Sequence, residues 1–276
     1  MIAIGVHGPE LAGMTIGHEL TIAHQPFERL ALEHAVVVGG SKGLGLVVVD
    51  RFLARGFFVT VLSRRPSDRH IGDRNVRHLA VDLETPGGAK GVWDEARAVA
   101  GPIRYLALCQ RFRGQGDPWA GEIQVSLTAS RDLIEGFGPH FCETGDRAIG
   151  VVSSVYAQFV GGSQPVGYHV VKAGLNELVR YYAVAFGRRG VRVNAIMPLT
   201  YLKDESRHFY AANAKLTDVY DKLVPLRRMG EAADSANALD FLCSEKASFI
   251  NGQSLFIDGG VSVVWPEEVA KAFAGP

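Results

Sequence analysis

Tyr168 and Lys172 have the residue types and the spacing for acid-base chemistry. They are four positions apart on a predicted helix and therefore share one of its faces. An ammonium group beside a phenol favours the phenolate, so we expect Lys172 to lower the pKa of Tyr168 from its ordinary value of about 10. Such a tyrosine can give a proton to a substrate oxygen or take one from it. The hydroxyl of Ser154, at the end of a predicted strand, could hold that oxygen in place.

A glycine cluster near residue 40 predicts a site for a phosphate group. The stretch AVVVGGSKGLGLVVVDRFLARG is typical of a buried strand, a tight turn and an amphipathic helix that ends at Gly56. Glycine permits φ > 0 and lets the backbone approach a ligand, and a helix N-terminus favours negative charge. The spacing of Gly39, Gly43 and Gly45 differs from the GxGxxG fingerprint, so a purely structural turn is the alternative.

The residues after the second predicted strand favour NADP over NAD. About 20 residues past the glycine turn, an NAD site carries an acid for the ribose 2′-hydroxyl, whereas this chain has Ser63 and Arg64. Together with Lys42 in the turn, they could bind a 2′-phosphate, and the alternative is a solvated basic loop. After the third predicted strand, Asp82 is placed either to reach an adenine edge or to cap a helix.

Strands and helices alternate from residue 34 to residue 262, which predicts one α/β domain. Helical connections imply a parallel sheet of about seven strands covered on both faces, a doubly wound Rossmann-type fold whose ligands bind beyond the carboxyl ends of the strands. Residues 1–33 are expected to form an N-terminal extension and residues 263–276 a C-terminal tail. The predicted strands are Ala35–Val38, Phe57–Leu62, Val76–Val81, Arg104–Leu108, Ala148–Val152, Val191–Ile196 and Ser254–Ile257, and the clearest helices are Tyr168–Phe186 and Ala232–Cys243.

Composition argues against several classes of protein. The 276 residues carry no net charge, which does not indicate nucleic acid or an anionic membrane as a partner. No apolar run approaches the roughly 18 residues of a membrane span. Cys109, Cys142 and Cys243 lack metal-site spacing and are expected to be free thiols of a cytoplasmic protein. The nine histidines form no metal motif.

Taken in order, these motifs resemble those of the classical short-chain dehydrogenase/reductase family over about residues 34–262. The family's TGxxxGxG turn matches residues 38–45, with valine in place of threonine. Its catalytic serine, tyrosine and lysine match Ser154, Tyr168 and Lys172, with one more residue than usual between the first two. The family's sixth-strand and closing-strand signatures resemble VNAIMP at 193–198 and FINGQSLFIDGG at 249–260.

The resemblance implies an NADP(H)-dependent oxidoreductase that interconverts a carbonyl and an alcohol on a small, apolar or ring-containing substrate. Segment 199–226 would cover the substrate, although a plain amphipathic helix gives the same pattern. The aromatic residues expected to line that pocket are Tyr201, Phe209, Tyr210 and Tyr220, with Phe112, Tyr156 and Phe159. The residues expected to contact the cofactor are Gly39, Ser41, Lys42, Gly43, Leu44, Gly45, Ser63, Arg64, Asp82, Leu83, Cys109, Gln110, Tyr168, Lys172, Pro198 and Thr200.

Two features depart from the family pattern. Cys109, Gln110, Arg111 and Phe112 replace the NNAG motif that steadies the sheet and approaches the cofactor ribose, and Arg111 could add a contact there. Ser126 replaces the family's fourth catalytic residue, an asparagine that helps to hold a water in the proton relay to the lysine. Ser126 could still bind a water, so we expect turnover with a modified relay.

These departures leave other functions open. A nucleotide-binding regulator or scaffold with weak or no catalysis would keep the fold, and the same site could carry out dehydration, epimerisation or imine reduction. The resemblance also implies a homotetramer or homodimer, for which the apolar residues 261–265 could serve as a contact.

Overall fold

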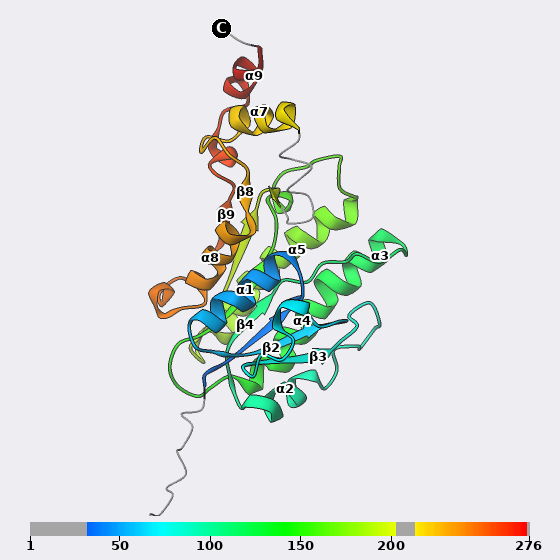
Figure 1. Cartoon of the computed structure of the whole chain (residues 1–276), viewed down its shortest axis with the longest axis vertical. Coiled ribbons are helices and arrows are strands. Elements are labelled where there is room, and N and C mark those ends of the chain that lie inside the picture. The colour runs from blue at the N-terminus through cyan, green and yellow to red at the C-terminus, as the bar shows by residue number, and fades with distance from the viewer. Residues whose placement is uncertain (1–31, 203–212, 275–276) are drawn as a thin grey trace, which may run out of the picture. The chain divides into compact units, whose positions relative to one another are not determined.

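The computed structural model describes residues 32–202 and 213–274. Seven strands form one parallel sheet in the order β3-β2-β1-β4-β5-β6-β9 (Figure 1). The order reverses direction between β1 and β4, which is where such sheets open a crevice for ligands. The strands are β1 His34–Val38, β2 Phe58–Ser63, β3 Val76–Ala80, β4 Ile103–Leu108, β5 Arg147–Val152, β6 Val191–Pro198 and β9 Ser254–Ile257. The predicted fold class is therefore confirmed.

Helices cover both faces of this sheet (Figure 1). Side chains of α1 and α8 pack on one face, and side chains of α2, α4 and α5 pack on the other. Because both faces are covered, the central strands are largely apolar, and all five residues of β1 are buried. The edge strand β3 is more polar, with Arg77 and His78. These helices are α1 Gly43–Ala54, α2 Val92–Ala100, α4 Ala129–Phe137, α5 Val166–Gly187 and α8 Ala232–Leu242.

All seven predicted sheet strands are present, with ends that differ by at most two residues from the prediction. The first helix stops where its glycine signal indicated, since Gly56 takes a left-handed φ of 83° just after it. The sequence gave no sign of a second sheet, in which β7 (Tyr201–Leu202) pairs with β8 (Gly230–Glu231). Strands of two residues are too short to leave a periodic pattern.

One connection contains an irregular helix that bears on the site. The helix α3 (Pro118–Glu122) continues without a break into a π-helical stretch, Ile123–Thr128, and then into α4. Stretches of π-helix are rare and often occur at functional sites. The remaining described helices are α7 (Ala214–Leu223) and α9 (Pro266–Ala274), which contact each other.

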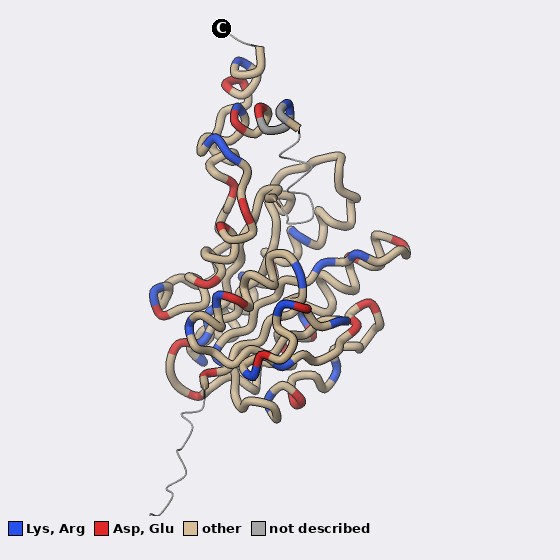
Figure 2. The backbone as a smooth tube through the Cα atoms, viewed as in Figure 1, with Lys and Arg blue, Asp and Glu red and all other residues tan. Residues whose placement is uncertain are grey.

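Thiols and charges follow the expected pattern. All three cysteines are free, as predicted. Figure 2 shows basic and acidic residues interspersed along the described chain. Within residues 32–202 and 213–274, every helix is too short or too polar to cross a membrane.

Candidate functional site

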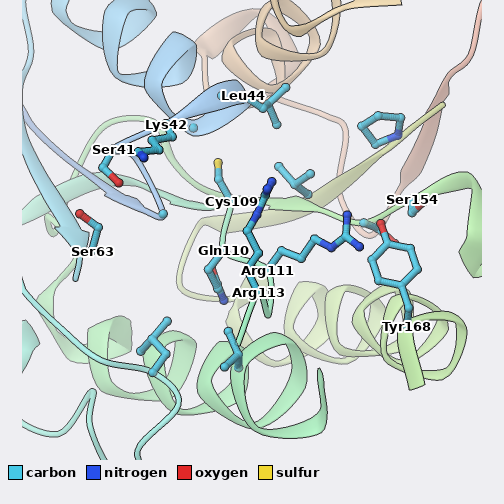
Figure 3. Close-up of a pocket in the computed structure, with 18 of the residues that line it drawn as sticks. Ser41, Lys42, Leu44, Ser63, Cys109, Gln110, Arg111, Arg113, Ser154 and Tyr168 are labelled. Carbon is cyan, nitrogen blue, oxygen red and sulfur yellow. The ribbon is translucent and has the colours of Figure 1, made fainter. Parts of the chain in front are cut away.

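A cavity of about 830 Å³ opens at the carboxyl edge of the large sheet (Figure 3). This volume falls within the range of about 300–1,000 Å³ that is typical of ligand and cofactor sites. Every residue predicted to bind the cofactor lines it, and so do the predicted catalytic residues Ser154, Tyr168 and Lys172. Ser126 is the predicted site residue that does not.

The glycine turn forms one end of the cavity. Gly39 and Gly43 take positive φ values of 74° and 55°, as predicted for the turn. A Cβ atom on Gly39 would lie 2.9 Å from the backbone of Gln110, and one on Gly45 would collide with the carbonyl oxygen of Gly39. A Cβ on Gly43 would meet nothing within 4 Å. The turn thus packs tightly against the backbone at Gly39 and Gly45 and stays open at Gly43, where α1 begins. An open helix N-terminus of this kind fits the pyrophosphate of a dinucleotide.

Charged residues surround the cavity beside this turn. The Arg64 Nη1 donates to Glu84 Oε1 at 2.7 Å, and the Ser63 hydroxyl donates to the carbonyl oxygen of Arg65 at 2.8 Å. The Asp82 carboxylate accepts a hydrogen bond from the backbone N–H of Glu84. No helix begins at Asp82, because α2 starts ten residues later, so the helix-cap alternative is wrong.

The opposite end of the cavity brings together the predicted catalytic residues. The Tyr168 side chain is directed towards Ser154 (Figure 3), whose hydroxyl is close enough to lower the pKa of the phenol. Lys172 is one turn further along α5, with its Nζ 5.5 Å from the centre of the Tyr168 ring. That Nζ donates to the carbonyl oxygen of Val152 at 2.8 Å, which fixes the lysine at the end of β5. Tyr168 and Ser154 therefore face the same end of the cavity, with Lys172 beside the tyrosine.

The predicted direction of the Tyr168 pKa is wrong for this structure. Burial raises the pKa of Tyr168, and the nearby Ser154 hydroxyl and the charge of Arg111 oppose this rise only in part. Burial also lowers the pKa of Lys172, to about 8, while the carboxylate of Glu122 opposes that change. Both groups are more than nine-tenths shielded from water, so desolvation outweighs the lysine–phenol pairing on which the prediction rested.

Arg111 lies directly against the catalytic tyrosine. Its guanidinium carbon is 4.6 Å from the centre of the Tyr168 ring, a cation–π distance. Its Nη2 donates to Gln164 Oε1 at 2.8 Å, which holds the guanidinium over the ring. The sequence showed that the NNAG motif had been replaced, but it could not show where the new side chain points.

Glu122 is a site residue that sequence reasoning missed. It is 3% exposed, and its Oε2 accepts a hydrogen bond of 2.6 Å from the hydroxyl of the fully buried Ser126. The Ser126 hydroxyl, which was predicted to hold a relay water, thus donates its hydrogen bond to the Glu122 carboxylate instead. Glu122 precedes Ser126 by four residues, and this helical spacing is the signal that could have revealed the pair.

Cys109 and Gln110 keep the structural part of the role expected for the NNAG motif. The backbone N–H of Cys109 donates to Val38 and so joins β4 to β1. The Gln110 Nε2 donates to the hydroxyl of Ser130, and that hydroxyl donates to the carbonyl oxygen of Ser126. Burial raises the pKa of the Cys109 thiol to about 12, so it is neutral and a poor nucleophile.

The aromatic residues predicted to line the substrate pocket divide into three groups. Tyr156 and Tyr201 line the cavity. Among the described residues, Phe112, Phe159 and Tyr220 do not line it. Phe209 and Tyr210 lie outside the described residues.

A parallel sheet that carries a glycine turn at one end of a cavity and a buried tyrosine and lysine at the other is typical of nucleotide-dependent oxidoreductases. Residues 39–262 match the family model described as Enoyl-(Acyl carrier protein) reductase. The chain belongs to the short-chain dehydrogenases/reductases, an oxidoreductase family that uses the nicotinamide cofactors NAD(H) or NADP(H).

Similar proteins span nearly the same length. Glucose 1-dehydrogenase of Gluconobacter oxydans (strain 621H) is 26% identical over 263 residues, covering 86% of this chain and 94% of that protein. D-threitol dehydrogenase of Mycolicibacterium smegmatis is 27% identical over 265 residues, covering 91% and 100%. The solved structure of 4-hydroxyisoleucine dehydrogenase complexed with NADH shares the fold, with a TM-score of 0.74, 22% identity and coverage of 84% and 100%.

Proposed function

We propose that this protein is an NADP(H)-dependent oxidoreductase that interconverts a carbonyl and an alcohol on a small substrate. The observation that carries the proposal is the placement of Tyr168, Ser154 and Lys172 together at one end of a cavity whose other end is the glycine turn. When bound, the nicotinamide cofactor supplies or accepts a hydride at the substrate carbon.

Tyr168 acts as the general acid of the reduction. Its pKa is raised by burial, so the phenol keeps its proton at neutral pH and can give it to a carbonyl oxygen. The Ser154 hydroxyl orients the same oxygen. Lys172, held at the end of β5, provides the positive charge that stabilises the tyrosinate left after the proton transfer.

Glu122 is proposed as a positioning residue that acts through Lys172. The lysine is buried and its pKa is lowered to about 8, so its charge at neutral pH depends on a nearby anion. Glu122 is the carboxylate that raises this pKa, and Ser126 orients it. The pair therefore acts on the charge of Lys172, the lysine at which the family's relay ends.

Basic residues at the nucleotide end support the choice of NADP. The cavity is lined there by the basic residues Lys42, Arg64 and Arg65, together with the hydroxyl-bearing Ser63. The ion pair between Arg64 and Glu84 involves side chains that are 56% and 34% exposed, and such pairs contribute little stability. A 2′-phosphate could therefore bind Arg64 without displacing a strong interaction.

The test is to follow NADPH oxidation spectroscopically with a panel of ketones and aldehydes, in the wild type and in Tyr168→Phe. We expect the variant to lose about 10²–10⁴-fold in kcat, because the general acid is removed. NADPH affinity should change less than about twofold, since the phenol is not its main contact. Tyr181→Phe, an exposed position on the same helix, is the matched control and should keep full activity. Full activity in Tyr168→Phe would reject the proposal, and NADPH binding without turnover in the wild type would favour a regulator.

A further inference from the structure

The catalytic end of the cavity is positively charged. Arg111, Arg113 and Lys172 line it, whereas the acidic residues that line the cavity, Asp82 and Glu84, follow β3 at the nucleotide end. Glu122 is buried behind this surface and does not line the cavity among the described residues. The place where a substrate would react thus faces cations.

Arg111 is the cation nearest the reacting position, and its orientation is fixed. The guanidinium lies against the Tyr168 ring (Figure 3). It is held there by a hydrogen bond to Gln164. Gln164 is on the segment between Ser154 and Tyr168, so the clamp comes from the catalytic loop itself. An arginine whose planar fork is already oriented loses little side-chain entropy when it binds a planar anion.

The charge of Arg111 is unpaired within the described part of the chain. Its hydrogen-bond partner there is the neutral amide of Gln164, and its buried Nε has no partner. Arg111 also lowers the pKa of both Tyr168 and Lys172, as a second cation in a poorly solvated site must. Arg111 is half-buried and lines the cavity, whereas the carboxylate of Glu122 lies behind this surface and is hydrogen-bonded to Ser126. The guanidinium fork is therefore open to an anion that enters the cavity.

We propose that Arg111 binds a carboxylate of the substrate, and that the protein interconverts hydroxy acids and oxo acids whose carboxylate is one or two carbons from the reacting carbon. This inference rests on the proposed function and specifies its substrate class. The guanidinium of Arg111 lies against the Tyr168 ring. A substrate carboxylate bound by Arg111 would therefore be only a few bonds from the carbonyl oxygen that Tyr168 protonates. A carboxylate matches the guanidinium fork with two parallel hydrogen bonds.

The bound acid would react without a change in its charge. The carbonyl carbon gains a hydride from the nicotinamide cofactor, the carbon–oxygen π bond breaks, and the oxygen gains the proton of Tyr168. The carboxylate remains on Arg111 throughout. Tyr156 and Tyr201 line the cavity beside this point and would contact an apolar or ring-containing body, which was the expectation from the sequence.

The experiment compares phenylpyruvate with its methyl ester, which has the same body but no charge. For the wild type we expect kcat/KM to be at least tenfold higher for the acid. Arg111→Gln should lower the ratio of kcat/KM for the acid to kcat/KM for the ester about 10- to 100-fold, whatever its effect on Tyr168 common to both substrates. Arg111→Lys keeps the charge but not the planar fork, so its preference for the acid should lie between those of the wild type and Arg111→Gln. The control is Arg97→Gln, at an exposed position on α2, which should leave kcat/KM unchanged for both substrates.

Binding gives a readout that needs no turnover. Calorimetric titration of phenyllactate into the protein with NADP⁺ should show a loss of affinity of about tenfold or more in Arg111→Gln. Equal kcat/KM for acid and ester, an equal loss for both in Arg111→Gln, or unchanged phenyllactate affinity would overturn the carboxylate assignment. A preference for dihydroxyacetone phosphate over phenylpyruvate would overturn it too, in favour of a phosphate. Absence of turnover with every carbonyl compound, with Arg111-dependent phenyllactate binding retained, would instead count against the proposed reaction alone.

Discussion

The two ends of the cavity are built in different ways. The nucleotide end is shaped by backbone, because one contiguous segment supplies a strand, three glycines and a helix N-terminus. The catalytic end is shaped by charged and hydroxyl side chains from separate elements, with Arg111 after β4, Glu122 at the end of α3 and Tyr168 on α5. The first end should therefore not tolerate added atoms at Gly39 and Gly45, where backbone packs closely, and the second should respond to each change of charge.

Adding one carbon atom to the turn tests the first half of this contrast. In Gly45→Ala, the new Cβ would collide with the carbonyl oxygen of Gly39, a backbone atom that cannot rotate away. We expect the free energy of unfolding to fall by about 1–3 kcal/mol, as for other overpacked sites. NADPH affinity should fall at the same time, because the turn must open. Chemical denaturation and a fluorescence titration of NADPH measure the two effects.

Gly116→Ala is the control for this substitution. A Cβ at Gly116 meets no atom within 4 Å, and the residue does not line the cavity. Both stability and NADPH affinity should remain near those of the wild type. If Gly45→Ala behaves like Gly116→Ala, the turn is not held by backbone packing and the contrast between the two ends is lost.

The same contrast explains what the sequence could predict. The glycine turn, the strand before it and the helix after it are neighbours in the chain, so local spacing was enough to place Gly39, Gly43 and Gly45. Tyr168 and Lys172 were also found by local spacing, on one helix. The seven strands followed from apolar runs, because a parallel sheet buried on both faces needs them.

What the sequence could not show depends on burial and on contacts between distant elements. The lowering of the Tyr168 pKa was predicted from a neighbouring charge, but the opposing cost of burial is a tertiary effect. The position of Arg111 depends on Gln164, 53 residues further along the chain. Glu122 lies where α3 passes into the π-helical stretch. Its spacing of four residues from Ser126 could have indicated the pair, but the burial of its carboxylate depends on how this helix packs against distant elements.

Removing the charge of Glu122 tests the second half of the contrast. Glu122 raises the pKa of Lys172, so Glu122→Gln should lower that pKa below its present value of about 8. If reduction requires charged Lys172, the pH above which kcat declines should move to lower pH in this variant. Arg111→Gln should move it to higher pH, because Arg111 lowers the same pKa. Profiles of kcat against pH between 6 and 10 (about the range in which a perturbed lysine titrates) show both shifts.

A structural role for Glu122 would give a different result. In that case Glu122→Gln would lower stability, or lower kcat at all pH values, without moving the pH at which kcat declines. That outcome would contradict the proposed coupling to Lys172. Glu95→Gln on α2 is the matched control, because Glu95 is exposed and away from the cavity. Its pH profile should match that of the wild type.

The smallest expected effect is at the nucleotide end, where a side chain does contribute. Arg64→Ala should reduce the ratio of NADP to NAD affinity by about twofold to tenfold, because an exposed and screened charge contributes little. Glu84→Gln should raise the ratio, since it releases Arg64 from its ion pair. Titrations of both cofactors at fixed salt measure the ratios. Tighter binding of NAD than of NADP by the wild type, or a ratio that neither substitution changes, would show that the basic loop does not read the 2′-phosphate.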